Sequence, residues 1–207
     1  MQEHSFRIEK TNRFYTAGNL ADASKILIVL HGYGQSAFFF LKKFEYLVSK
    51  GYFIVAPEGM HRFYLEGTSG RVGASWMTRE ARLDDIQDNF NYLENLLNYY
   101  TTSKATLSIH LLGFSQGAAT ATRWFEKSKF TFNSLVLWAS VFPDDVSMEI
   151  KNNKQTIFYF VLGDNDPYFT KENAQKCIAI YESLEFKILR FEGKHEINHG
   201  VVTKLFG

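Results

Sequence analysis

Short apolar runs recur along the chain and predict the strands of a buried sheet. Each run is nearly continuous, which is typical of strands that are covered on both faces, whereas one exposed face would give an alternating pattern. These runs are found at 26–30, 52–56, 107–112, 135–138, 157–162 and 186–191.

The segments between these runs predict helices. Apolar residues recur at steps of three or four over 83–97, with acids and amides on the other face, and a second helix is predicted at 40–47. Strands that alternate with helices indicate the α/β class, with a mostly parallel sheet and helices on both faces. No repeat or Pro/Gly/Ser-rich linker divides the chain, so residues 1–207 are predicted to form one domain.

The N-terminal region has a different pattern. Segments 5–8 and 13–16 are separated by the polar residues 9–12, which predicts an antiparallel hairpin with Phe6 and Ile8 directed inward.

The strongest candidate for chemistry follows the run 107–112. Residues 113–117 read Gly-Phe-Ser-Gln-Gly and precede the small residues 118–121, so a G-x-S-x-G sequence stands between a predicted strand and a predicted helix. A sharp turn of this kind exposes the serine hydroxyl and needs small neighbours. Ser115 is therefore the candidate nucleophile, and the alternative is an ordinary strand-to-helix turn.

A second glycine-rich loop follows the run 26–30, with the sequence His-Gly-Tyr-Gly-Gln-Ser at 31–36. Its glycines allow the backbone to approach a substrate, so the N–H groups of Tyr33 and Gln116 are the predicted oxyanion donors. The alternative is a simple turn with Ser36 as the N-cap of the next helix, and both roles are compatible.

Two later loops supply the remaining groups of a catalytic triad. Gly-Asp-Asn-Asp-Pro at 163–167 contains two acids, Asp164 and Asp166, and Glu-Gly-Lys-His at 192–195 contains His195. The order serine, acid, histidine is that of α/β-hydrolases. His195 is predicted to be the base, and these residues alone leave the acid open between the two aspartates.

A rival motif overlaps the last loop, because residues 195–199 spell H-E-x-x-H, as in zinc peptidases. A catalytic zinc ion needs a third protein ligand, yet none of the eight residues after His199 is Glu, Asp, His or Cys. We therefore expect no metal, and we expect His199 to be a surface or packing residue of the last helix.

The long loop 58–78 contains Trp76, which is a candidate for lining an acyl pocket, with plain packing as the alternative. The stretch 140–155 is too short for a helical cap domain, so the nucleophile is expected to face an open groove. An open groove buries little of a long chain, which favours short to medium acyl groups.

Composition limits the classes of partner that the protein is expected to bind. The formal charge is +1, from 23 basic and 22 acidic residues, which argues against nucleic acid or an anionic membrane as the partner. Cys177 is the only cysteine, so no internal disulfide can form. No run reaches the roughly 18 to 20 apolar residues of a membrane span, and the expected location is the cytoplasm.

The motifs HGYG, GFSQGAA, GDNDP and GKHE together resemble the phospholipase/carboxylesterase family of α/β-hydrolases, which includes acyl-protein thioesterases. The resemblance implies an α/β-hydrolase fold and the activity of a serine hydrolase. It implies Ser115, Asp166 and His195 as the triad, and Tyr33 and Gln116 as oxyanion donors. Gln35 departs from the family, which usually has Asp there, and Tyr168 to Thr170 replace its Val-Pro.

The predicted activity is hydrolysis of a small-molecule ester or thioester through an acyl-enzyme, with no cofactor and no stable association with a membrane. Two alternatives are a zinc metallopeptidase and a non-catalytic α/β-hydrolase that binds a small molecule.

Overall fold

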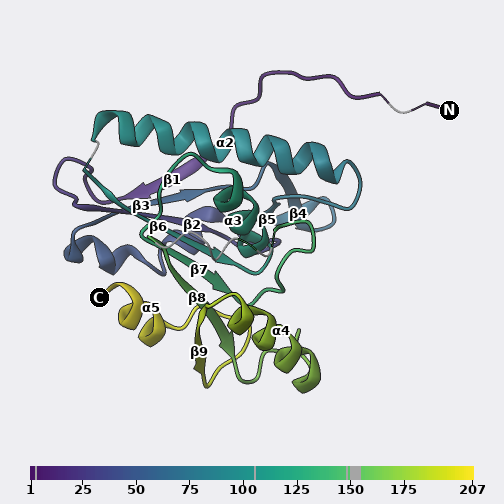
Figure 1. Cartoon of the computed structure of the whole chain (residues 1–207). Coiled ribbons are helices and arrows are strands. Elements are labelled where there is room, and N and C mark those ends of the chain that lie inside the picture. The colour runs from purple at the N-terminus through teal and green to yellow at the C-terminus, as the bar shows by residue number, and fades with distance from the viewer. Residues whose placement is uncertain (3, 105, 148, 150–154) are drawn as a thin grey trace.

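A seven-stranded sheet forms the centre of the computed structural model, which describes residues 1–2, 4–104, 106–147, 149 and 155–207 (Figure 1). The strand order is β1-β3-β2-β6-β7-β8-β9, and every neighbouring pair is parallel except β1 with β3. The strands are β1 (Phe14–Ala17), β2 (Lys25–Leu30), β3 (Tyr52–Pro57), β6 (Ser108–Phe114), β7 (Ser134–Trp138), β8 (Ile157–Gly163) and β9 (Lys187–Phe191).

The strands predicted from the six apolar runs are confirmed, and so is the α/β-hydrolase architecture that they imply. All residues of β3 and β7 are buried, as are all but the first of β2, because helices cover both faces of the sheet. The helices are α1 (Ala37–Leu41), α2 (Arg82–Ser103), α3 (Gln116–Lys127), α4 (Lys171–Ser183) and α5 (His199–Phe206), with the 3-10 helix η1 (Glu45–Lys50).

Two neighbouring residues of β3 show how the faces are covered. The ring of Phe53 lies 5.1 Å from that of Tyr100 in α2, whereas the ring of Tyr52 lies 5.9 Å from that of Phe206 in α5. Successive side chains of a strand point to opposite faces. Helices α2 and α5 therefore pack on opposite faces of the sheet, as Figure 1 shows.

The prediction of an N-terminal hairpin was wrong about the strand that β1 pairs with. Strand β1 is antiparallel as expected, but it pairs with the edge of β3, and residues 5–8 form no strand. Phe6 and Ile8 are 89% and 77% exposed, so they do not point inward. The main-chain groups of β1 gain more from a preformed sheet edge than from a short isolated hairpin, which is marginally stable in water.

The predicted loop 58–78 is also different, because it contains the antiparallel pair β4 (His61–Glu66) and β5 (Ser69–Ser75). The predicted helix over 40–47 is divided between the end of α1 and the start of η1.

Within 139–156, where a cap domain would be inserted, the described residues 139–147, 149 and 155–156 contain no α-helix. Residues 148 and 150–154 lie outside the described residues. In the part of the chain that the structure describes, no helix is both long and apolar enough to cross a bilayer.

Candidate functional site

The candidate nucleophile stands on a strained turn between β6 and α3. Ser115 has φ 54° and ψ −120°, a conformation that residues other than glycine rarely adopt. Its N–H donates to Trp138 O at 2.8 Å, which ties the turn to β7. A Cβ atom at Gly113 or Gly117 would collide with backbone atoms, so both flanking glycines are required for this close packing.

His195 and Asp166 are brought together from the loops after β9 and β8. His195 Nδ1 lies 2.7 Å from Asp166 Oδ2, and the Asp166 side chain is fully buried. Asp166 Oδ1 accepts the N–H of Tyr168 at 2.9 Å. The rings of Tyr168 and Phe114 lie 4.5 and 4.7 Å from the imidazole, so packing as well as hydrogen bonding fixes its orientation.

Backbone hydrogen bonds hold these two loops side by side. Asn165 N–H donates to Gly193 O at 2.9 Å, and Asp164 N–H donates to Phe191 O at 2.9 Å. The carboxylate of Asp164 points elsewhere, because it forms an ion pair with Arg190 and its side chain is 41% exposed. Of the two aspartates, only Asp166 contacts His195 among the described residues.

Ser115 and His195 line the same cavity, which has a volume of about 680 Å³. No hydrogen bond joins the Ser115 hydroxyl to His195 within the described part of the chain, and such contacts are often longer before substrate binds. The other lining residues are Gly32, Tyr33, Gln35, Phe114, Gln116, Ala119, Ala139, Ser140, Val141, Phe142, Tyr168, Phe169, Asn173, Lys176, Cys177 and Ile180.

The cavity runs from Ser115 towards α4, through a wall that the sequence did not predict. Val141 and Phe142 follow β7, Phe169 follows β8, and Ile180 lies on α4. The loop after β7 could have been identified as part of the cavity from the sequence, because ligands of such sheets bind beyond the carboxyl ends of strands. The helical face of α4 gave no comparable signal, since its apolar residues have the spacing of any packed helix.

The two predicted oxyanion residues, Tyr33 and Gln116, both line this cavity. The side chain of Gln116 has a structural task as well: its Oε1 accepts the N–H of Trp76 at 2.9 Å, and its Nε2 donates to Met77 O at 2.8 Å. Gln35 Oε1 similarly accepts the N–H of Gly32 at 2.9 Å. Sequence reasoning missed both contacts, although a glutamine directly after the serine was a signal.

Trp76 does not line the cavity, so the interpretation as an acyl-pocket residue was wrong and the packing alternative holds. Its side chain is fully buried, and its Nε1 donates to His31 O at 2.8 Å. The indole also lies against the imidazole of His31, with ring centroids 5.1 Å apart. Trp76 thus supports the glycine-rich loop from behind.

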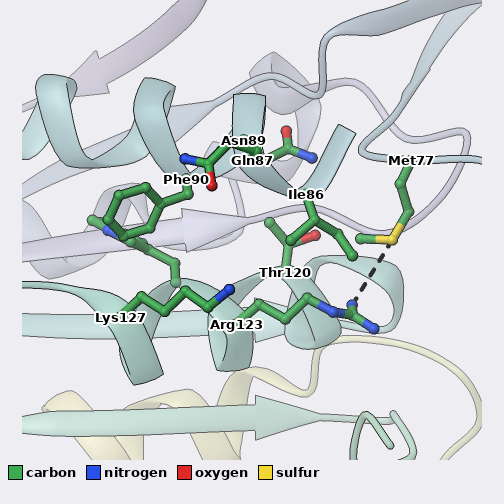
Figure 2. Close-up of a pocket in the computed structure, with 9 residues that line it drawn as sticks. Met77, Ile86, Gln87, Asn89, Phe90, Thr120, Arg123 and Lys127 are labelled. Carbon is green, nitrogen blue, oxygen red and sulfur yellow. Dashed lines mark hydrogen bonds between the residues drawn. The ribbon is translucent and has the colours of Figure 1, made fainter. Parts of the chain in front are cut away.

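Behind Met77, a crevice of about 10 Å³ separates α2 from α3 (Figure 2). Arg123 lines it, with Nη1 3.8 Å from Met77 Sδ, and its guanidinium makes two hydrogen bonds with Asp145, at 2.8 and 2.6 Å. The hydrogen bonds from Arg123 lower the pKa of the Asp145 carboxyl. This volume holds at most one water molecule, so the crevice is part of the scaffold and not a substrate site.

The positions of His195 and His199 do not have the geometry of a zinc-peptidase motif. A zinc-peptidase motif places both histidines on one helix, but α5 begins only at His199, and His195 lies in the preceding loop. The ring of His199 packs on Tyr46 with centroids 4.2 Å apart. No cluster of three or more potential metal ligands occurs among the residues that the structure describes.

Solved structures with the same fold include a carboxylesterase from Mesorhizobium loti, with a TM-score of 0.72 and 13% identity over 94% of this chain and 93% of that one. An acyl-protein thioesterase 2 from Zea mays gives 0.68 and 16% identity over 95% and 100%. The carboxylesterase of Bacillus cereus gives 0.67 and 16% identity over 94% and 91%. The expected likeness to carboxylesterases and acyl-protein thioesterases is thereby confirmed for the fold.

No relative was found among the curated proteins. A family model described as Serine hydrolase (FSH1) matches residues 21–199, a range that contains the glycine-rich loop, the strained serine turn and the His195 loop. The chain therefore belongs to the serine hydrolase (FSH1) family.

Proposed function

We propose that this serine hydrolase cleaves carboxylic esters or thioesters of short to medium acyl chains through an acyl-enzyme on Ser115. The observation that carries the proposal is the hydrogen bond of 2.7 Å between His195 and Asp166, at the wall of a cavity that Ser115 also lines. Because His195 uses Nδ1 for Asp166, its Nε2 is left to exchange protons with the serine.

The mechanism begins when His195 Nε2 takes the proton of the Ser115 hydroxyl and Oγ attacks the carbonyl carbon. The Tyr33 and Gln116 N–H groups stabilise the resulting oxyanion, at about 3 kcal/mol for each donor. The bond to the leaving oxygen or sulfur then breaks, and His195 returns the proton to it. His195 then deprotonates a water molecule, which attacks the acyl-enzyme. As the bond between the acyl group and Ser115 Oγ breaks, His195 returns the proton to Oγ, and the carboxylic acid is released. Asp166 holds the imidazole in the required tautomer.

The test of this chemistry is the Ser115→Ala variant, which removes only the nucleophilic oxygen. We expect hydrolysis of 4-nitrophenyl butyrate and labelling by a fluorophosphonate to disappear, with the melting temperature unchanged or raised because alanine is no more strained than serine. Ser140→Ala serves as the control, since Ser140 lines the same cavity without a place in the mechanism. Hydrolysis that persists in Ser115→Ala would refute the proposal.

The preference for acyl length rests on the cavity walls. Val141, Phe142 and Ile180 offer apolar surface, and each methylene group buried there gains about 0.8 kcal/mol. The cavity is open to solvent, so we expect kcat/KM to rise up to chains of about four to eight carbons and then to level off. A steady rise to palmitate esters, or a jump on adding micelles, would contradict this expectation.

We further propose that residues 1–207 act as one domain with a small-molecule ester or thioester as the partner, without nucleic acid or stable membrane association. The near-neutral net charge of +1 supports this view.

A further inference from the structure

A second cavity, of about 270 Å³, lies on the other side of the glycine-rich loop 32–36. Helix α1 forms one wall and the β4–β5 hairpin forms the other. Its lining residues are Gly34, Gln35, Ser36, Phe39, Phe40, Lys43, Leu65, Arg71 and Val72. Only Gln35 also lines the catalytic cavity among these described residues.

Backbone hydrogen bonds join the glycine-rich loop to β5 beside this second cavity. Gly34 N–H donates to Ala74 O at 2.9 Å, and Ala74 N–H donates to Gln35 O at 3.0 Å. A Cβ atom at Gly73 would collide with the backbone of Gly34, so the hairpin and the loop touch at this point. The two walls are therefore parts of one built structure and keep their spacing.

The charged residues that line the second cavity are all positive. Lys43 and Arg71 line it, no aspartate or glutamate does, and neither cation has an ion-pair partner among the described residues. Lys42 adds a third charge nearby, with Nζ 5.6 Å from the ring centroid of the lining residue Phe39. The Glu66 carboxylate lies at the tip of the hairpin over Gly70 and is not part of the lining.

The same cavity is apolar on its remaining surface. Phe39, Leu65 and Val72 line it and are 60%, 43% and 40% exposed, so their apolar area is available to a ligand. Two unpaired cations beside exposed apolar side chains match a molecule with an anionic head and a short apolar chain.

We propose that the second cavity binds a soluble amphipathic anion, a compound with one phosphate or carboxylate group on a short alkyl chain. Lys43 and Arg71 hold the head group, and Phe39, Leu65 and Val72 cover the chain. The volume of about 270 Å³ limits the ligand to a chain of moderate length. The occupant contacts Gln35, whose side chain holds the N–H of Gly32, so it lies directly against the loop that carries the proposed oxyanion donor Tyr33.

The experiment is calorimetric titration of the Ser115→Ala variant with hexyl phosphate, which needs no hydrolysis and so tests this site independently of the proposed function. We expect hexyl phosphate to bind at least tenfold tighter than either inorganic phosphate or hexanol, because both the head and the chain contribute. The Lys43→Gln/Arg71→Gln double variant should bind it about tenfold more weakly, the size expected for two exposed ion pairs.

A matched control is the Arg7→Gln/Lys50→Gln variant, which removes one arginine and one lysine at exposed positions away from the cavity and should bind normally. Unchanged melting temperatures would show that each variant is folded. Equal affinity in both double variants would overturn the proposal. So would loss of binding when a small phosphonate blocks Ser115 in the wild-type protein, because the ligand would then occupy the catalytic cavity. Binding to phosphatidylglycerol vesicles without binding of hexyl phosphate would overturn it in favour of a membrane surface.

Discussion

Two histidines stand at the carboxyl ends of strands on either side of Ser115, and their surroundings are opposite. His31, after β2, is fully buried, and both of its ring nitrogens are engaged: Nδ1 lies 2.7 Å from Gly32 O, and Nε2 accepts the N–H of Gly59 at 3.0 Å. His195, after β9, has a side chain that is 18% exposed, and only its Nδ1 takes part in a hydrogen bond within the described part of the chain. A free ring nitrogen at a cavity is what proton transfer requires, so His195 is suited to catalysis and His31 to holding the loop.

The electrostatic environment deepens this contrast. Burial lowers the pKa of His31, which keeps the ring neutral, and the hydrogen bond to Gly32 O opposes this only in part. The neutral ring donates through Nδ1 and accepts through Nε2, as its two partners require. The first three predictions test whether the two regions differ in function as they do in structure.

The largest effect is expected from His195→Ala. Loss of the base should lower kcat/KM for 4-nitrophenyl butyrate by about 10⁴-fold or more, with little change in melting temperature because the ring borders the cavity. His199→Ala is the control and should stay within about threefold of the wild type, since its ring contacts Tyr46 and not the triad. Equal losses in the two variants, restored by zinc, would instead favour the metallopeptidase.

The next effect concerns the acid. Asp166→Asn should lower kcat by about 10³-fold, because the amide no longer stabilises the imidazolium or fixes its tautomer. Asp164→Asn should change kcat by less than about threefold, since it loses only an exposed ion pair with Arg190. Steady-state kinetics of both variants provide the test, and the reverse ranking would assign the acid to Asp164.

A smaller effect on activity, but a clear one on stability, is expected from His31→Phe. The phenyl ring still packs on Trp76, yet Gly59 N–H and Gly32 O lose their buried partner, at about 1–3 kcal/mol for each group. Chemical denaturation should show this loss, whereas kcat/KM of the folded enzyme should fall less than tenfold. A loss of activity as large as that of His195→Ala would remove the distinction between the two histidines.

The smallest effect is a pH dependence of stability. Burial, assisted by the charge of Lys25, lowers the pKa of His110 to about 4, below the value of about 6.5 in an unfolded chain. Between these values the unfolded chain binds a proton that the native state does not, so the free energy of unfolding should fall as the pH drops from about 6.5 to about 4. His110→Asn should flatten the decline in urea titrations over this range. If the free energy of unfolding of His110→Asn falls with pH as steeply as that of the wild type, groups other than His110 cause the decline.

The parts of the fold that the sequence predicted are those in which burial leaves a local pattern. The strands β2, β3 and β7 lie between two layers of helices, which requires continuous apolar runs. The hairpin β4–β5 was missed because its first strand is mostly exposed and lacks such a run. Gly67, with φ 66° at the turn, was the available signal.

The sequence by itself determined the proposed chemistry, from a serine between two glycines after a strand, followed in order by acids and a histidine in later loops. These features are local, because a strained turn and a strand end dictate residue types within a few positions. Tertiary structure alone decided that Asp166 and not Asp164 contacts His195, that Trp76 supports His31, and that α4 forms a wall of the cavity. Each of these joins segments that are distant in the chain, and such contacts are set by how the helices and loops pack on the sheet.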